Sequence, residues 1–234
     1  MLIQILLLLL IGNSQAGEVA YIPKGNCDQK IHHQYYSICY SDDHRQAKWT
    51  YHKLTLKSIN GKQKRTNDFR EDPNLDDPVG KKDFSGSGYD RGHMVPAGDM
   101  KLSKTSMSQT FYMSNMSPQN SSLNRGLWGS LEMKIRSWVR DDGDAFVVTA
   151  PVLEKNLDRI DSGVSIPDYY YKIVYFPNTD VMKAFLIPNK KPIDKNFYNY
   201  SVSVDEIEKI TGLDFFAELP NSVENKLEAI NYYE

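Results

Sequence analysis

An apolar residue returns at every fourth position between Ser121 and Arg140. The side chains that repeat are those of Leu123, Leu127, Leu131, Ile135 and Val139. On a helix of 3.6 residues per turn, this spacing puts them in one stripe along one face. Because an apolar stripe is stable only when a second layer covers it, the pattern predicts a helix over 121–140 that packs against the core of the fold.

Short runs rich in β-branched and aromatic residues predict strands on both sides of this helix. The runs cover residues 35–40, 48–54, 145–149, 169–176 and 181–187. A second helix is expected over 204–211, because Ser203 stands at the N-cap, Glu206 follows three residues later and Gly212 ends the segment. Since strands and helices do not alternate regularly, we expect an α+β fold with a mostly antiparallel central sheet.

The first sixteen residues predict a secretory signal peptide. Residues 1–11 are almost all Leu and Ile, and Ser14 and Ala16 suit the small-residue positions before a signal-peptidase cut. The apolar run is shorter than the roughly 18 residues of a transmembrane helix. We therefore expect a cleaved signal at 1–16, one domain over 17–234, a secreted or periplasmic protein, and no membrane attachment after cleavage. The alternative is an uncleaved apolar anchor, because the segment lacks the usual Lys or Arg.

Cys27 and Cys39 are the only two cysteines. In an oxidising compartment, two cysteines this close in sequence are expected to form a disulfide, and the alternative is a pair of buried thiols. A zinc or catalytic role is not expected, because neither cysteine belongs to a Cys-x-x-Cys motif.

The charges nearly cancel over the whole chain, with 28 Lys and Arg against 30 Asp and Glu. This balance argues against a protein that holds nucleic acid through a global excess of positive charge. The distribution is uneven, however. Residues 45–70 carry eight basic side chains and one acidic one, whereas residues 201–234 carry eight acidic and two basic. A near-neutral chain can thus present one basic face, although ordinary solvated surfaces explain such runs as well.

Two segments contain residues suited to chemistry. Residues 90–93 read Asp-Arg-Gly-His, and a histidine beside charged neighbours can act as a general base near neutral pH; the alternative is a hydrogen-bonded histidine in a surface loop. On the predicted long helix, a second series of residues recurs with the same four-residue spacing, each one position after a residue of the apolar stripe. It comprises Asn124, Trp128, Glu132 and Arg136.

Amide oxygen, carboxylate and guanidinium groups on successive helical turns could hold a hard cation with its water ligands and bind a phosphate oxygen. The spacing alone is explained equally by an exposed helix face with a Glu132–Arg136 pair at i,i+4.

Taken in order along the chain, these segments make the sequence similar to the DNA/RNA non-specific endonucleases, a family that includes secreted sugar-non-specific nucleases and endonuclease G. The matching strings are Asp-Arg-Gly-His at 90–93, Ser-Asn-Met-Ser-Pro-Gln at 114–119, Leu-Asn-Arg-Gly-Leu-Trp at 123–128, then Leu131, Glu132 and Arg136. The resemblance covers about residues 40–219. It implies a ββα-metal (His-Me finger) fold whose central sheet is flanked by helices.

The resemblance also implies a secreted endonuclease that uses Mg²⁺, or alternatively Mn²⁺, to hydrolyse phosphodiester bonds in DNA and RNA without selecting sequence or sugar. His93 would be the general base that takes a proton from the attacking water. Asn124 would be the one direct protein ligand of the metal. Glu132 would hold water ligands of the metal, unless it serves only the structure of the helix.

Three arginines would bind the phosphate and stabilise the charge of the transition state, namely Arg65, Arg91 and Arg136. Arg70 could replace Arg65 in this role. Asn115 would contact substrate and orient the site. DNA and RNA are the expected partners, with a protein inhibitor as a further one. The alternatives are a secreted nucleic-acid-binding protein without catalysis and a hydrolase of another small phosphodiester; a pure binding protein, however, needs no general base.

Overall fold

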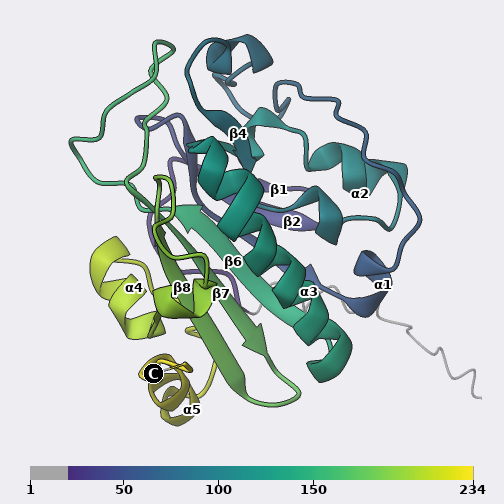
Figure 1. Cartoon of the computed structure of the whole chain (residues 1–234), viewed down its shortest axis with the longest axis vertical. Helices are drawn as coiled ribbons and strands as arrows, with labels where there is room; N and C mark the ends of the chain where they lie inside the picture. Colours follow the sequence, from purple (N-terminus) through teal and green to yellow (C-terminus); the bar gives the residue numbers. More distant parts are fainter. Residues whose placement is uncertain (1–20, 234) are drawn as a thin grey trace, which may run out of the picture.

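The computed structural model describes residues 21–233 of the 234-residue chain. Seven strands form one sheet in the order β1-β2-β3-β6-β7-β8-β9, and all neighbours are antiparallel. They are β1 (Gln29–His32), β2 (Tyr36–Ser41), β3 (Gln46–Leu54), β6 (Ala145–Pro151), β7 (Tyr169–Phe176), β8 (Val181–Pro188) and β9 (Ser201–Val202). The predicted α+β fold with an antiparallel central sheet is confirmed (Figure 1).

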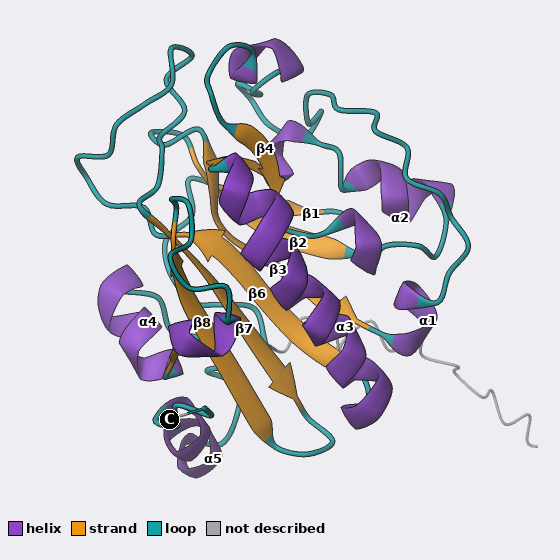
Figure 2. Ribbon diagram, viewed as in Figure 1, coloured by secondary structure: helices purple, strands orange, loops and turns teal. Residues whose placement is uncertain are grey.

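Different helices cover the two faces of this sheet (Figure 2). On one face lies α3 (Gly129–Asp142), and the whole predicted apolar stripe is buried there in one hydrophobic cluster. On the other face lie α4 (Val204–Thr211) and α5 (Asn221–Glu228), which pack through Ile207 and Leu227. Successive residues of a strand point to opposite faces, so β7 contributes alternate side chains to the two clusters.

A second, two-stranded sheet lies at the N-terminal end of the long helix (Figure 1). It pairs β4 (Asp90–His93) with β5 (Met116–Gln119) in antiparallel register, with His93 opposite Met116. Two strands followed directly by the long helix form the ββα unit that the family resemblance implies.

The long helix differs from the regular α-helix that was expected. Residues Leu123–Trp128 form a π-helical segment, and α3 continues from it. Trp128, predicted on the polar series, is only 1% exposed and packs edge-on against Tyr170 with 5.7 Å between ring centroids. Such π-helical turns are frequent at functional sites.

The five predicted strands and both predicted helices are present, and α4 coincides with its predicted range. The Ser203 hydroxyl caps α4 by accepting from the Glu206 backbone N–H, and Gly212 ends the helix with a φ of 68°. The other elements were not predicted, because they are short or polar: β1, β4, β5, β9, α1 (Leu56–Ile59), α2 (Lys104–Gln109), α5, and 3-10 turns at Lys81–Phe84, Ala97–Asp99, Met113–Asn115 and Phe197–Tyr200.

Cys27 and Cys39 are joined by a disulfide across 5.2 Å between Cα atoms. The bond ties the segment before β1 to β2 and lies at the edge of the cluster that α4 and α5 cover. The signal peptide predicted at residues 1–16 lies outside the described residues. Within residues 21–233, no helix is long and apolar enough to cross a membrane.

Candidate active site

His93 ends β4 between two aromatic rings. Its ring centroid lies 5.0 Å from that of Phe111 and 5.8 Å from that of Phe69, both in edge-to-face geometry. Nε2 is buried and has no hydrogen-bond partner within residues 21–233. Burial, together with the positive charge of Arg65, lowers the pKa of His93 to about 3. The imidazole is therefore neutral throughout the neutral pH range.

Position 92, immediately before His93, requires a glycine because β4 and β5 approach each other closely there. A Cβ at position 92 would lie 2.4 Å from Oε1 and 2.6 Å from Cβ of Gln119, whose strand pairs with β4. Gln119 is fully buried, so it has little room to move away. Only a glycine lets the two strands approach this closely.

Asp90, the first residue of the Asp-Arg-Gly-His string, connects β4 to the helix. Its Oδ2 accepts hydrogen bonds from Nδ2 of Asn124 at 2.9 Å and Nε of Arg125 at 2.8 Å, and its Oδ1 accepts from Nη2 of Arg125 at 2.6 Å. Burial alone would raise the pKa of Asp90, but the hydrogen bonds from Arg125 and Asn124 outweigh it and lower that pKa. Because Nδ2 of Asn124 is engaged, its carbonyl oxygen is the atom available to a cation.

Glu132 and Arg136 lie one turn apart beyond Asn124, each with a side chain that is 16% exposed. Nη1 of Arg136 lies 4.0 Å from Oε2 of Glu132 and donates to Oδ1 of Asp99 at 2.7 Å. Oδ2 of Asp99 in turn lies 3.2 Å from Nε2 of the buried His52. The two residues are thus not part of an exposed helix face, which was the alternative interpretation of their spacing.

Lys172 of β7 lies beneath the helix and is 1% exposed. Its Nζ donates to Oγ1 of Thr149 at 2.6 Å and lies 5.0 Å from the centroid of the Trp128 ring. Burial raises the pKa of Glu132 and lowers that of Lys172, and the attraction between the two groups opposes both shifts. A buried lysine therefore helps to keep Glu132 ionised.

Arg65 and Arg91 stack on the two rings that enclose His93. The Arg91 guanidinium lies 4.7 Å from the centroid of Phe69, and that of Arg65 lies 4.8 Å from the centroid of Phe111. Nε of Arg65 also donates to Oδ1 of Asn67 at 2.7 Å. Two guanidinium groups are thereby held beside the imidazole.

Arg70, the alternative to Arg65, has other partners. Its guanidinium lies 4.1 Å from the Tyr112 ring centroid and donates to the backbone of Ser108 and to the side chain of Asp68. These contacts tie the segment before α2 to the segment after it. The structure thus brings Arg65, rather than Arg70, next to His93.

The structure places Asn115, predicted to contact substrate and to orient the site, inside the fold. Its side chain is fully buried, and its amide exchanges two hydrogen bonds with the Val95 backbone and donates a third to the carbonyl of Thr110. Its own carbonyl accepts from the N–H of Met94. No polar atom is left for a ligand, and Asn115 instead holds the chain that leaves His93.

Four residues of the site were missed from the sequence as contributors, namely Asp90 as an anchor of Asn124, and Asp99, His52 and Lys172. Lys172 did leave a signal, because it is the one charged residue in the apolar and aromatic strand Tyr169–Phe176. Half of the eight basic residues over 45–70 are paired with carboxylates. Arg45, Lys48, Lys53 and Arg70 lie within 4.0 Å of carboxylates.

The chain shows clear similarity to known nucleases. The sequence profile of the family described as DNA/RNA non-specific endonuclease matches residues 15–222. Nuclease C1 of Cunninghamella echinulata is 35% identical over 83% of this chain and 85% of its own length. The mitochondrial Nuclease 1 of Schizosaccharomyces pombe is 31% identical over 88% of this chain and 71% of its own length.

A solved structure of EndoG in complex with EndoGI, described under the mechanism of EndoG inhibition, superposes with a TM-score of 0.76. It is 26% identical and covers 84% of this chain and 89% of its own. Sequence profile, relatives and fold agree with one another and with the ββα geometry around His93 and Asn124. The chain therefore belongs to the DNA/RNA non-specific endonuclease family and is a nuclease, a hydrolase of phosphodiester bonds.

Proposed function

We propose that this nuclease is a secreted, Mg²⁺-dependent endonuclease that cuts both DNA and RNA without selecting sequence. The observation that carries the proposal is the Asp90–Asn124 hydrogen bond, because it holds the neutral His93 strand against the helix that bears the candidate metal ligand. The charged groups gathered around His93 recognise phosphate rather than base edges. Phosphate contacts carry no direct sequence information, which supports a non-specific enzyme.

Nucleases of this family typically depend on a divalent metal ion. The donor set suits Mg²⁺, with Mn²⁺ as the alternative, because a neutral amide oxygen from Asn124 and a nearby carboxylate from Glu132 are hard oxygen groups. Asn124 would hold the ion directly, and Glu132 would hold its water ligands. When bound, the ion would stabilise negative charge on the phosphate oxygens.

His93 would take the proton from the attacking water. Since Nε2 is buried, Nδ1 is the ring nitrogen that we assign to this step. Arg65 and Arg91 would bind the phosphate from the side of the two phenylalanines, and Arg136 would do so from the helix. Because Asp99 already holds Arg136, that guanidinium would bind without first giving up rotamer freedom.

The test is to incubate the purified protein with plasmid DNA, single-stranded DNA and RNA, with Mg²⁺ or with EDTA. We expect degradation of all three substrates only with Mg²⁺. His93→Ala should cut at least about 10²-fold more slowly while still binding DNA. His32→Ala is the matched control, because the exposed His32 side chain hydrogen-bonds to the Ser37 hydroxyl, away from the candidate active site. Cleavage in EDTA, or full activity of His93→Ala, would reject the mechanism.

Secretion forms a separate part of the proposal and rests on the sequence of residues 1–16. We propose that this segment is removed and that residues 17–234 form the nuclease domain. N-terminal sequencing of protein recovered from the medium or periplasm should begin at Gly17, and an intact Met1 in that fraction would contradict cleavage.

We also propose a protein inhibitor as a partner. The description of the EndoG structure as an inhibited complex supports it. Extract of producing cells should then slow cleavage, and protease treatment of the extract should abolish the effect.

A further inference from the structure

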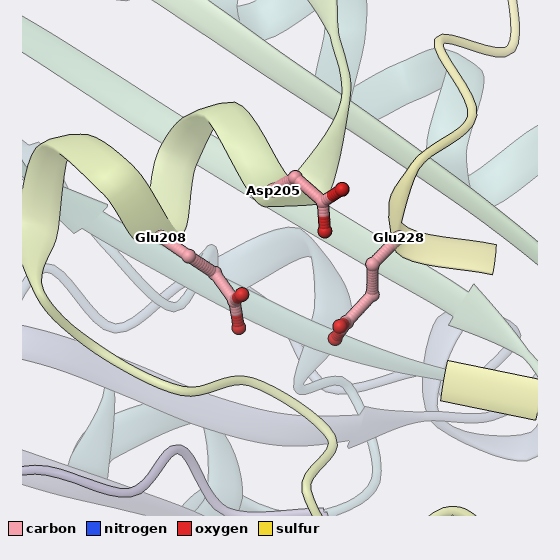
Figure 3. A group of neighbouring side chains, drawn as sticks. All are labelled: Asp205, Glu208 and Glu228. Atoms are coloured by element: carbon pink, nitrogen blue, oxygen red, sulfur yellow. The ribbon is translucent and has the colours of Figure 1, made fainter. Parts of the chain in front are cut away.

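Three carboxylates from α4 and α5 converge on the sheet face opposite α3. Asp205 and Glu208 lie one turn apart on α4, and Glu228 is the last residue of α5. One oxygen from each lies within 4.8 Å of the others, and Figure 3 shows the three side chains directed toward a common space. The acidic end of the chain, which the nuclease site does not use, is the source of this cluster.

Glu228 is buried in the cluster without compensation. It is 4% exposed, and its Oε1 has no hydrogen-bond partner within residues 21–233. Nor does any Lys or Arg nitrogen in that part of the chain lie within 4.0 Å of the three carboxylates. A buried carboxylate without a partner is costly, so its place here needs a reason.

The helix end and the neighbouring carboxylates increase the free-energy cost of burying an ionised Glu228 side chain. Glu228 closes α5, where the helix dipole is negative and disfavours an anion. Burial, together with the negative charges of Glu208, Glu224, Asp205 and Asp214, raises the pKa of Glu228 to about 8, so without a bound cation this carboxyl group holds a proton at neutral pH. Glu208 is itself a carboxylate, which accepts the backbone N–H of Phe215 through Oε1 at 2.7 Å and offers Glu228 no hydrogen-bond donor. A cation is the simplest group that would satisfy all three carboxylates at once.

We propose that Asp205, Glu208 and Glu228 form a calcium-binding site that fastens α5 to α4, separate from the catalytic centre. Ca²⁺ takes six to eight oxygen ligands at about 2.3–2.6 Å, so two ligands on one ion are at most about 5 Å apart, in keeping with the observed separations. Mg²⁺ fits less well, because it demands a tighter octahedron and keeps most of its water. The absence of His and Cys from the cluster argues against zinc.

The site would stabilise the C-terminal part of the fold. Ile207 of α4 and Leu227 of α5 belong to the same hydrophobic cluster beneath the carboxylates. Neutralising the repulsion would therefore hold both helices against the sheet. Catalysis lies on the other face and should not require calcium.

Thermal unfolding tests the proposal, with Mg²⁺ at equal concentration in all samples. The added probe is CaCl₂ at about 10 mM, at least ten times the Kd of about 10⁻⁴–10⁻³ M that extracellular calcium sites show. We expect Ca²⁺ to raise Tm by about 3–6 °C, the shift for a ligand at ten times its Kd in a domain of this size. Isothermal titration should show one Ca²⁺ bound per chain at this site.

Two variants separate this site from nonspecific effects. Asp205→Asn, at an exposed position, and Glu228→Gln should each lose the Ca²⁺-induced rise in Tm. Both should keep nuclease activity in Mg²⁺, which shows that they fold. Glu206→Gln is the matched control, because it removes the same charge from an exposed position of α4 outside the cluster, and it should keep the full rise.

The catalytic centre is a competing site for Ca²⁺. Asn124→Ala removes the proposed catalytic ligand, and the Ca²⁺-induced rise should persist in that variant. The inference is overturned if Ca²⁺ leaves the Tm of the natural chain unchanged. It is equally overturned if Asp205→Asn and Glu228→Gln respond as the natural chain does.

Discussion

His93 is half-buried beside Phe69, Phe111 and the guanidinium of Arg65, so water stabilises its charged form less than that of an exposed histidine. This setting keeps the His93 ring unprotonated at neutral pH, but a general base works best when its pKa lies near the operating pH, so the negative charge of a bound phosphate would have to raise the pKa of His93. The same setting costs stability in acid. The folded pKa of about 3 lies below the unfolded value of 6.5, so the unfolded chain binds more protons across that interval and stability falls as pH is lowered through it.

The histidine can be titrated directly. We expect the NMR signal of the His93 ring in metal-free protein to titrate far below pH 6.5. Arg65→Ala should raise this pKa, because it removes a positive charge that opposes protonation. Lys195→Ala, at an exposed position on a different loop, should leave it in place. A His93 titration near pH 6.5 would contradict the burial argument.

Lys172 gives a second prediction at this scale. Lys172→Met should move the acid limb of the kcat/KM profile to higher pH, because Glu132 loses the positive charge that lowers its pKa. Each further rise of one pKa unit lowers the rate about tenfold on that limb.

Lys183→Met is the control for Lys172→Met. Lys183 is also a buried lysine of the sheet, but it stacks on Trp138 and Tyr232. Identical pH profiles for both variants would show that Lys172 does not act on Glu132.

The β4–β5 hairpin and the long helix form the element on which the proposed chemistry depends. The pairing of β4 with β5 fixes the position of His93 along its strand. The hydrogen bond between Asp90 and Asn124 fixes the distance of that strand from the helix. The π segment fixes the direction in which the Asn124 side chain projects from the helix. None of these three contacts involves an apolar side chain. The hairpin therefore depends on close backbone approach, which is where Gly92 matters.

Gly92→Ala should reduce kcat by about 10²-fold, the loss expected when a reacting group is displaced by about 1 Å. The added methyl group would collide with Gln119 and push β4 away from β5. Gly126→Ala is the matched control, because a Cβ there meets nothing within 4 Å, and it should keep its activity. The measurement is single-turnover cleavage of an oligonucleotide. A fully active Gly92→Ala would show that the hairpin tolerates the displacement.

Over the whole molecule, two groups of like charge lie apart. Arg65 and Arg91 lie beside His93, whereas the acidic cluster of Asp205, Glu208 and Glu228 belongs to α4 and α5, which pack on the sheet face opposite α3. The net charge of −2 therefore conceals a local group of basic residues beside His93. We expect this group to hold nucleic acid.

This distribution predicts modest, salt-sensitive binding. With three phosphates neutralised by Arg65, Arg91 and Arg136, affinity for duplex DNA should fall about 40-fold between 50 and 200 mM salt. The measurement is the Kd of His93→Ala protein across that range. Arg91→Ala should lower the steepness of log affinity plotted against log salt concentration by about 1, because one phosphate contact is lost. A slope that matches many more contacts, or no salt dependence, would contradict the reading of the charges.

The sequence by itself determined the elements whose residues repeat with a fixed period. The apolar stripe over 121–140, the strand Tyr169–Phe176 and the capped helix Val204–Thr211 follow from local rules, because burying one face of an element imposes its period on neighbouring residues. The motif strings likewise determined the family and the set of candidate residues. Polar strands such as Asp90–His93 were missed, because they lack any apolar alternation.

Only the tertiary structure decided which polar groups meet. The hydrogen bond from Asn124 to Asp90 spans 34 positions, and Lys172 approaches Glu132 from a separate strand. Asn115 belongs to one of the motif strings that match the family, yet its side chain is engaged in hydrogen bonds with the backbone of Val95. The reason is physical: a polar group's role depends on its burial and its partners, and both are set by the packing of distant elements, which local patterns do not contain.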